Sequence, residues 1–255
     1  MDLLSILFVN PFVEMADSPV FLMEVIVSGL LTGVLYSFVA LGFVLIFKAS
    51  GVFNFAQGAM VLFAALTLVG LIEHGVPVII AFVLTAAVMV ALAALIEGLM
   101  LRHLVNQEGI ILFMATIGLN FILEGAGQIA WGSDVKKLNV GLPDTTIEWA
   151  GMLLGTLDLT GAAIAAILVT FLAFFFHYTT IGRALRAVAD DHQAALSVGI
   201  PLKTIWIIVW AVAGCVALVA GIMWGAKSGV QFSLALIALK ALPVLISGGF
   251  TSVPG

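Results

Sequence analysis

The chain has 255 residues, of which 63% are apolar and only 9% charged, and its mean hydropathy is +1.28. A soluble domain carries about 25% charged residues, so this composition excludes an ordinary soluble enzyme and a disordered chain. A net charge of −5 also argues against a nucleic-acid-binding protein, which needs a basic face for the phosphates.

Seven hydrophobic segments follow one another along the chain, and a membrane-spanning helix needs about 20 apolar residues. We therefore predict an all-α, polytopic helical bundle in a membrane, forming one domain over residues 1–255. The first segment is longer than a span requires and should tilt, bend or protrude. The second is short, so it either spans or is re-entrant. The segments are residues 20–47, 56–72, 76–101, 110–131, 160–178, 205–225 and 232–250.

Two stretches, residues 132–159 and 179–204, carry enough charge to lie outside the membrane. If residues 179–204 are cytoplasmic and all seven segments span, five basic residues fall inside and three outside. This modest bias follows the positive-inside rule and favours that orientation. The inside set is Lys48, Arg102, Arg183, Arg186 and Lys203, and the outside set is Lys136, Lys137 and Lys227.

Nothing in the sequence supports catalysis. The four histidines are scattered near segment ends without the spacing of metal ligands. Residues 221–228, GIMWGAKS, place Ala226 where a phosphate-binding loop requires glycine. We predict no catalytic residue, no metal and no cofactor in this chain, so any ATP hydrolysis belongs to another chain.

Small residues recur every four positions at Gly29, Gly33 and Ser37, and again at Gly221 and Gly225. Such spacing allows helix backbones to approach closely in a membrane. We expect these faces to pack within the chain, with a contact between subunits as the alternative.

Polar groups within the hydrophobic segments are candidates for function, because they cost free energy at membrane depth. They are Glu97, Asn120, Glu124 and Lys240. Lys240 lies near the middle of the last segment and must face a cavity or find a partner. Glu124 or Glu97 would make a structural pair with it, and a role beside a pathway is the alternative.

Residues 50–58, SGVFNFAQG, join two apolar segments with amides and glycines instead of charges. Unwound backbone of this kind is tolerated where it lines a cavity or is buried in protein. A plain cytoplasmic turn is the alternative.

The segment 179–204 contains strong helix formers from Arg183 to Leu196, and Gly199 and Pro201 then predict the end of a helix. Arg183 and Arg186 are followed one turn later by Asp190 and Asp191. A charged helix at this place indicates a docking element for a soluble partner, or an interfacial helix that ends a span.

Three motifs resemble one known family. Residues 193–199, QAALSVG, resemble the EAAxxxG coupling motif of ABC-importer permeases, with Gln193 in place of the glutamate. Residues 33–60 resemble a first helix that bears Tyr and Gly and leads into NFAxG, and residues 239–255 resemble a KA…GG…SxPG segment. The order and context are those of the branched-chain amino-acid permease family.

This resemblance implies a membrane subunit of an ATP-driven importer in the bacterial inner membrane, which moves branched-chain or other small apolar amino acids by alternating access. It implies a homologous permease subunit, two cytoplasmic ATPases that bind ATP and Mg, and an extracytoplasmic solute-binding protein as partners. The expected coupling residues are Arg183, Arg186, Asp190, Asp191, Gln193, Ala194, Ala195 and Gly199. The pathway candidates are Tyr36, Asn54, Phe55, Gln57, Gly58, Asn120, Glu124 and Lys240.

Two alternatives stay open: the same fold importing urea or short amides, and a secondary carrier that works alone. Members of the family continue beyond SxPG, whereas this chain stops at Gly255. We therefore expect the chain to lack the family's C-terminal end.

Overall fold

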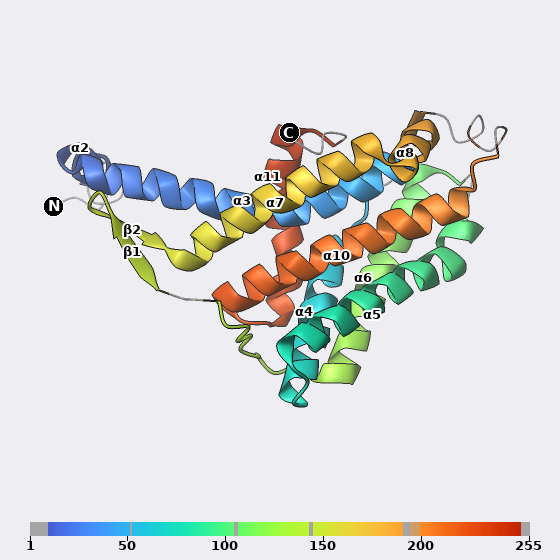
Figure 1. Cartoon of the computed structure of the whole chain (residues 1–255), viewed down its shortest axis with the longest axis horizontal. Coiled ribbons are helices and arrows are strands. Elements are labelled where there is room, and N and C mark those ends of the chain that lie inside the picture. The colour runs from blue at the N-terminus through green and yellow to red at the C-terminus, as the bar shows by residue number, and fades with distance from the viewer. Residues whose placement is uncertain are drawn as a thin grey trace.

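The computed structural model describes residues 10–51, 53–104, 107–142, 145–190, 195, 197 and 199–250. These residues form a bundle of helices with one small hairpin (Figure 1). Helices α3 and α7 run side by side, α10 packs against α3 and α5, and α11 crosses behind them. The helices are α2 (Asn10–Asp17), α3 (Pro19–Ser50), α4 (Gln57–Glu73), α5 (Val78–Leu99), η1 (Leu101–His103), α6 (Gly109–Trp131), α7 (Thr156–Tyr178), α8 (Thr180–Asp190), α10 (Leu202–Ser228), η2 (Phe232–Leu236) and α11 (Ile237–Gly248).

Five of the described helical segments are long and apolar enough to cross a membrane: α3, α5 together with η1, α6, α7 and α10. The prediction of a polytopic helical membrane protein is therefore confirmed. The predicted second and seventh segments form the shorter helices α4 and α11 instead of long spans. In the last segment, the residues of η2 adopt a 3-10 helix before the α-helix begins, which shortens the α-helical part to 12 residues.

Helix α3 is longer than a bilayer requires, as its sequence predicts. Its 32 residues extend about 48 Å, against a hydrocarbon core of about 30 Å. Pro19 lies in its first turn, where a missing N–H costs nothing. Gly51 ends it with a left-handed φ of 69°, and its N–H binds the carbonyl of Phe47.

Helix α4 lies at the centre of the bundle, in contact with α5, α6, α10 and η2. Thirteen of its 17 residues are buried, so it has no broad face for lipid. Helices α5, α6 and α7 differ, because many of their large apolar side chains are exposed, among them Ile79, Ile129 and Ile167. An apolar exposed surface on helices of this length is what a lipid solvent requires.

Within the polar stretch 132–159 the structure has a two-stranded antiparallel hairpin, an element that the sequence did not predict. Strand β1 (Thr146–Trp149) pairs with β2 (Met152–Gly155). Ala150 and Gly151, with φ of 52° and 81°, form the two-residue turn, whose positive φ values match the twist of hairpin strands. Glu24 of α3 accepts a hydrogen bond from the backbone N–H of Leu153 at 3.1 Å, which ties the hairpin to the start of α3.

The predicted small-residue faces differ in their surroundings. A β-carbon on Gly221 would lie 2.9 Å from the carbonyl oxygen of Val61, so α10 and α4 approach closely there. Gly225 is equally crowded by Val230 and Leu138. Around Gly29 and Gly33, by contrast, nothing lies within 4 Å of an added β-carbon. The expectation of close packing within the chain is confirmed for α10 and wrong for these two positions of α3.

Candidate functional site

A cavity of about 80 Å³ lies where α3, the loop after it, α6 and the η2–α11 segment meet. Three of the predicted pathway residues, Phe55, Asn120 and Glu124, line it together. The complete lining is Phe43, Phe53, Phe55, Asn120, Glu124, Ala235, Leu236, Ala238, Leu239 and Leu242. The sequence separations are large, so only the tertiary fold brings these side chains to one place.

Asn120 lies at the centre of α6. It is the eleventh residue after Gly109, the first of the helix, and the eleventh before Trp131, the last. At 1.5 Å per residue it is about 16 Å from either end. The cavity therefore lies at the depth of the middle of a spanning helix, and α4 begins near this level.

The loop between α3 and α4 is held at this depth by α6. The backbone N–H of Phe55 donates to Oγ1 of Thr116 at 3.0 Å, and that hydroxyl donates to the carbonyl of Phe113 at 2.8 Å. The rings of Phe43 and Phe53 stack with centroids 4.7 Å apart, and the ring of Phe55 meets Phe113 edge-on at 6.0 Å. Polar and aromatic contacts thus fix the unwound backbone in place.

Asn54 and Gln57 are fully buried beneath this loop. Oδ1 of Asn54 accepts a hydrogen bond from the N–H of Ala56 at 3.1 Å, and the backbone carbonyl of Asn54 accepts one from the N–H of Gln57 at 3.2 Å. Asn54 therefore shapes the turn that starts α4. Nε2 of Gln57 has no hydrogen-bond partner within the described residues and lies against Gly42 of α3. Among the described loop residues, Asn54 and Ala56 are buried and Phe53 and Phe55 are half-buried, whereas Gly51 at the end of α3 is exposed.

Gly58 has a steric role at the start of α4. An added β-carbon would lie 2.0 Å from the carbonyl oxygen of Ala235 and 2.8 Å from Cβ of Ala238. Only glycine lets α4 approach η2 and α11 this closely, and that approach closes one side of the cavity.

Two other predicted pathway residues lie away from the cavity lining. The ring of Tyr36 packs on Trp224 of α10 at 4.6 Å. Lys240 is exposed, although its neighbours Leu239 and Leu242 line the cavity. Lys240 lies in the first turn of α11 and, as its sequence position predicts, at the centre of the helical segment Phe232–Gly248, which is shorter than the five long apolar helices.

The predicted pairing of Lys240 with Glu124 or Glu97 is wrong for the part of the chain that the structure describes. Glu97, whose side chain is 3% exposed, instead pairs with Arg102 at 3.3 Å. Oε1 of Glu124 accepts a hydrogen bond from Nδ2 of Asn120 at 2.9 Å. Lys240 lies on an exposed side of α11, which explains why neither carboxylate meets it.

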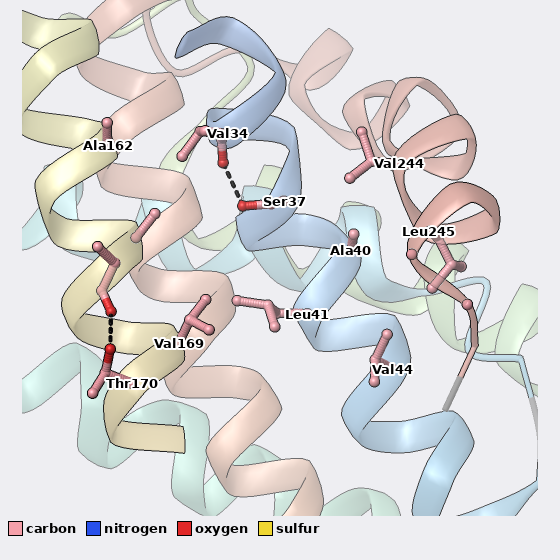
Figure 2. A pocket seen from close by; sticks show the side chains of 14 residues that line it. Val34, Ser37, Ala40, Leu41, Val44, Ala162, Val169, Thr170, Val244 and Leu245 are labelled. Carbon is pink, nitrogen blue, oxygen red and sulfur yellow. Dashed lines mark hydrogen bonds between the residues drawn. The ribbon is translucent and has the colours of Figure 1, made fainter. Parts of the chain in front are cut away.

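A larger apolar groove of about 410 Å³ lies between α3, α7 and α11 (Figure 2). Its hydroxyl groups are bonded within their own helices, Ser37 to the carbonyl of Val34 at 2.6 Å and Thr170 to that of Ala166 at 2.7 Å. Its lining has no charged side chain and, apart from these hydroxyls, is apolar or small. The groove offers nothing that would orient a charged or strongly polar molecule, so the smaller cavity is the better candidate site.

Helix α8 carries the two arginines among the predicted coupling residues, Arg183 and Arg186. Arg183 is exposed, whereas Nη1 of Arg186 donates to the carbonyl of Phe176 at 2.5 Å, at the end of α7. Gly182 faces the same carbonyl, 2.1 Å from where its β-carbon would lie. Helix α8 is therefore fixed to α7 while Arg183 faces outward.

The remaining coupling residues are described only in part. Ala195 is buried, and Gly199 has a φ of 85°, as expected for a residue that ends a helix before Pro201. Asp190 ends α8, but its side chain is outside the described part. Asp191, Gln193 and Ala194 lie outside the described residues.

Sequence reasoning missed Phe43, Phe53 and Thr116 as parts of the site. Phenylalanines on apolar helices ordinarily indicate packing or lipid contact, and a threonine within a span usually bonds its own helix. The close spacing of Phe53 and Phe55 around Asn54 was the one available signal for an aromatic lining.

Comparisons with known proteins agree with this architecture. A sequence profile described as "Branched-chain amino acid transport system / permease component" matches residues 25–255. The chain is 25% identical to the high-affinity branched-chain amino acid permease protein LivH of Salmonella typhimurium, over 94% of this chain and 83% of that protein. It is 26% identical to BraD of Pseudomonas aeruginosa, a permease protein of the same kind of system, over 91% and 81%. The autoinducer 2 permease protein LsrC of Shigella flexneri is 28% identical over 67% of this chain and 49% of its own. No solved structure matches the chain.

Proposed function

The chain belongs to the family of branched-chain amino acid transport system permease components, and from this premise we propose that it moves small apolar amino acids across the bacterial inner membrane. It does so as one subunit of an ATP-driven importer, together with a second permease subunit, two cytoplasmic ATPases and an extracytoplasmic solute-binding protein. LivH and BraD, to which the chain is similar along most of its length, are named for branched-chain amino acid transport.

The observation that carries this proposal is the cavity at the mid-depth of α6. The cavity is lined on one side by the unwound segment with Phe53 and Phe55 and on another by the start of α11. The polar side chains Asn120 and Glu124 also line it. Transporters bind substrate near the bilayer midplane, where helices are interrupted and backbone lines a cavity. At 80 Å³ the cavity is smaller than an ordinary ligand pocket of about 300 Å³ or more. We take this form as a closed state, which widens when helices move.

The joint between α7 and α8 supports coupling to an ATPase. Gly182 and Arg186 fix α8 to the end of α7, and Leu185 and Val188 are buried on the same side of α8. Arg183 is left facing outward for a partner. Because α8 and α7 are joined in this way, a force on α8 would be transmitted to α7, which packs along α3.

Uptake of labelled leucine, valine and urea by cells that carry the complete operon tests the proposal, with and without this gene. We expect leucine and valine uptake to require the gene and to stop when ATP is depleted. Urea uptake that depends on the gene while leucine uptake does not would replace the proposal with amide transport. Uptake that persists without the ATPase subunits would replace it with a carrier that works alone.

A lipid-facing substitution provides the matched control. Ile129 of α6 is 90% exposed, so Ile129→Leu should leave uptake unchanged. If Ile129→Leu abolishes uptake as completely as loss of the gene does, the substitution has lowered the amount of protein in the membrane. Uptake by every variant must then be divided by the amount of that variant in the membrane.

A further inference from the structure

Glu124 carries a carboxyl group on a spanning helix and has no cationic partner within the described chain. Its one hydrogen bond comes from Asn120, a neutral donor, at 2.9 Å. The described ion pairs join other carboxylates to Arg102, Lys136 and Lys227. A carboxylate at membrane depth is costly unless a positive charge or a proton compensates it. The described chain supplies no cation at this position, so a proton or the positive charge of a ligand must compensate the carboxylate.

The cavity beside Glu124 has the lining that a small organic cation requires. Three phenylalanines, Phe43, Phe53 and Phe55, form part of its lining, and the face of an aromatic ring attracts a cation. At about 80 Å³ the cavity is much smaller than an ordinary ligand pocket of about 300 Å³ or more. In this state it takes one end of an amino acid and not the whole molecule.

We propose that this cavity binds the ammonium group of the transported amino acid, with Glu124 as the counter-ion and Asn120 holding the carboxylate in place. The inference rests on the proposed function and deepens it, because it states which charged group of the substrate this chain recognises. A neutral molecule such as urea gains no ionic attraction from Glu124. A molecule that carries only a carboxylate is repelled.

The part of the lining that α11 contributes bears on the net charge of the ligand. Leu236, Ala238 and Leu239 line the cavity at the first turn of that helix. This part of the lining carries no charged side chain, so the cavity offers nothing besides Glu124 to offset the charge of a bare cation. A zwitterion has no net charge and enters the membrane at lower cost than a cation, so it should bind at a lower concentration than a simple amine with the same carbon skeleton.

Protection of Glu124 from a hydrophobic carbodiimide tests the site directly. Such reagents modify carboxyl groups within membranes, and mass spectrometry identifies the labelled peptide. The complete transporter in lipid nanodiscs is treated with dicyclohexylcarbodiimide alone, with leucine, with isoamylammonium, which lacks the carboxylate, or with isocaproate, which lacks the ammonium group. We expect leucine to protect Glu124 best, isoamylammonium to protect at higher concentration, and isocaproate not to protect.

Substitution of Glu124 provides the second measurement. Glu124→Gln should lower leucine uptake about tenfold or more, as loss of a buried charge contact does, and Glu124→Asp should retain part of it. Gln128, one turn further along α6 and exposed, is the matched control, and Gln128→Ala should leave uptake unchanged.

The outcomes separate this inference from the proposed function. If leucine uptake requires the gene but neither ammonium compound protects Glu124 and Glu124→Gln transports normally, the ammonium site is wrong and the function stands. Equal protection by isocaproate also overturns the site. If isoamylammonium protects Glu124 but leucine uptake does not require the gene, the ammonium site stands and amino-acid import is wrong.

Discussion

The backbone of α4 at Gly58 touches the backbone of η2 at Ala235, with no room for a side chain between them. We predict that Gly58→Ala lowers the free energy of unfolding by about 1–3 kcal/mol, because a carbonyl oxygen of the main chain cannot move aside as a flexible side chain can. Uptake should fall with it, since the same contact closes the cavity. Thermal unfolding in detergent, followed by size-exclusion chromatography, measures the change.

Gly118 is the control for that substitution. It lies inside α6, and nothing lies within 4 Å of an added β-carbon. Gly118→Ala should therefore leave stability unchanged or raise it by up to about 1 kcal/mol, the usual gain of alanine over glycine in a helix. Equal losses at Gly58 and Gly118 would contradict the steric explanation.

Thr116 anchors the loop at the cavity, and its hydroxyl is the only acceptor in the described chain for the N–H of Phe55. Thr116→Val keeps the shape but leaves that N–H unsatisfied, which should cost about 1–3 kcal/mol. Thr85 is also buried, but it bonds only the carbonyl of Ala81 in its own helix. Thr85→Val should cost much less, and a loss as large as that of Thr116→Val would show that burial, not the anchor, matters.

Substitutions of the two arginines of α8 should have different effects, one on stability and one on binding of the ATPase subunits. Arg186→Gln removes the guanidinium bond to the carbonyl of Phe176 and should lower stability by about 1–2 kcal/mol, since hydrogen bonds to charged groups are the stronger ones. Arg183→Glu should leave the melting temperature unchanged, because Arg183 is exposed, but weaken co-purification with ATPase subunits. Unchanged co-purification would assign Arg183 to solvated surface.

The pair between Glu97 and Arg102 should behave as a buried carboxylate with a half-exposed partner, since their side chains are 3% and 47% exposed. Arg102→Met leaves the carboxylate without its cation and should cost about 1–3 kcal/mol. Adding Glu97→Gln should recover most of that loss, because the unpaired charge is gone. A double mutant no more stable than Arg102→Met alone would argue against a buried charge at Glu97.

The sequence predicted the long helices well, because apolar runs of 20 or more residues leave few other structures in a membrane. It also singled out Asn120 and Glu124, since polar groups stand out on an apolar helix, and the structure places both on the lining of one cavity. It wrongly paired Lys240 with Glu124 or Glu97, because the side of α11 on which Lys240 lies depends on how that helix packs. It could not distinguish the crowded Gly58 from the open Gly29, because crowding depends on distant neighbours.

The burial of α4 has a consequence for the order in which the protein is made. Synthesis runs from the N-terminus, so α4 leaves the ribosome before α6, α10 and η2, which cover it in the finished structure. Asn54, just before α4, and Gln57, its first residue, are buried in the finished structure, so the start of α4 must first meet water, lipid or the insertion machinery. Residues 53–73 of the nascent chain therefore have other neighbours at first. Their final packing forms only when the C-terminal third of the chain has been made.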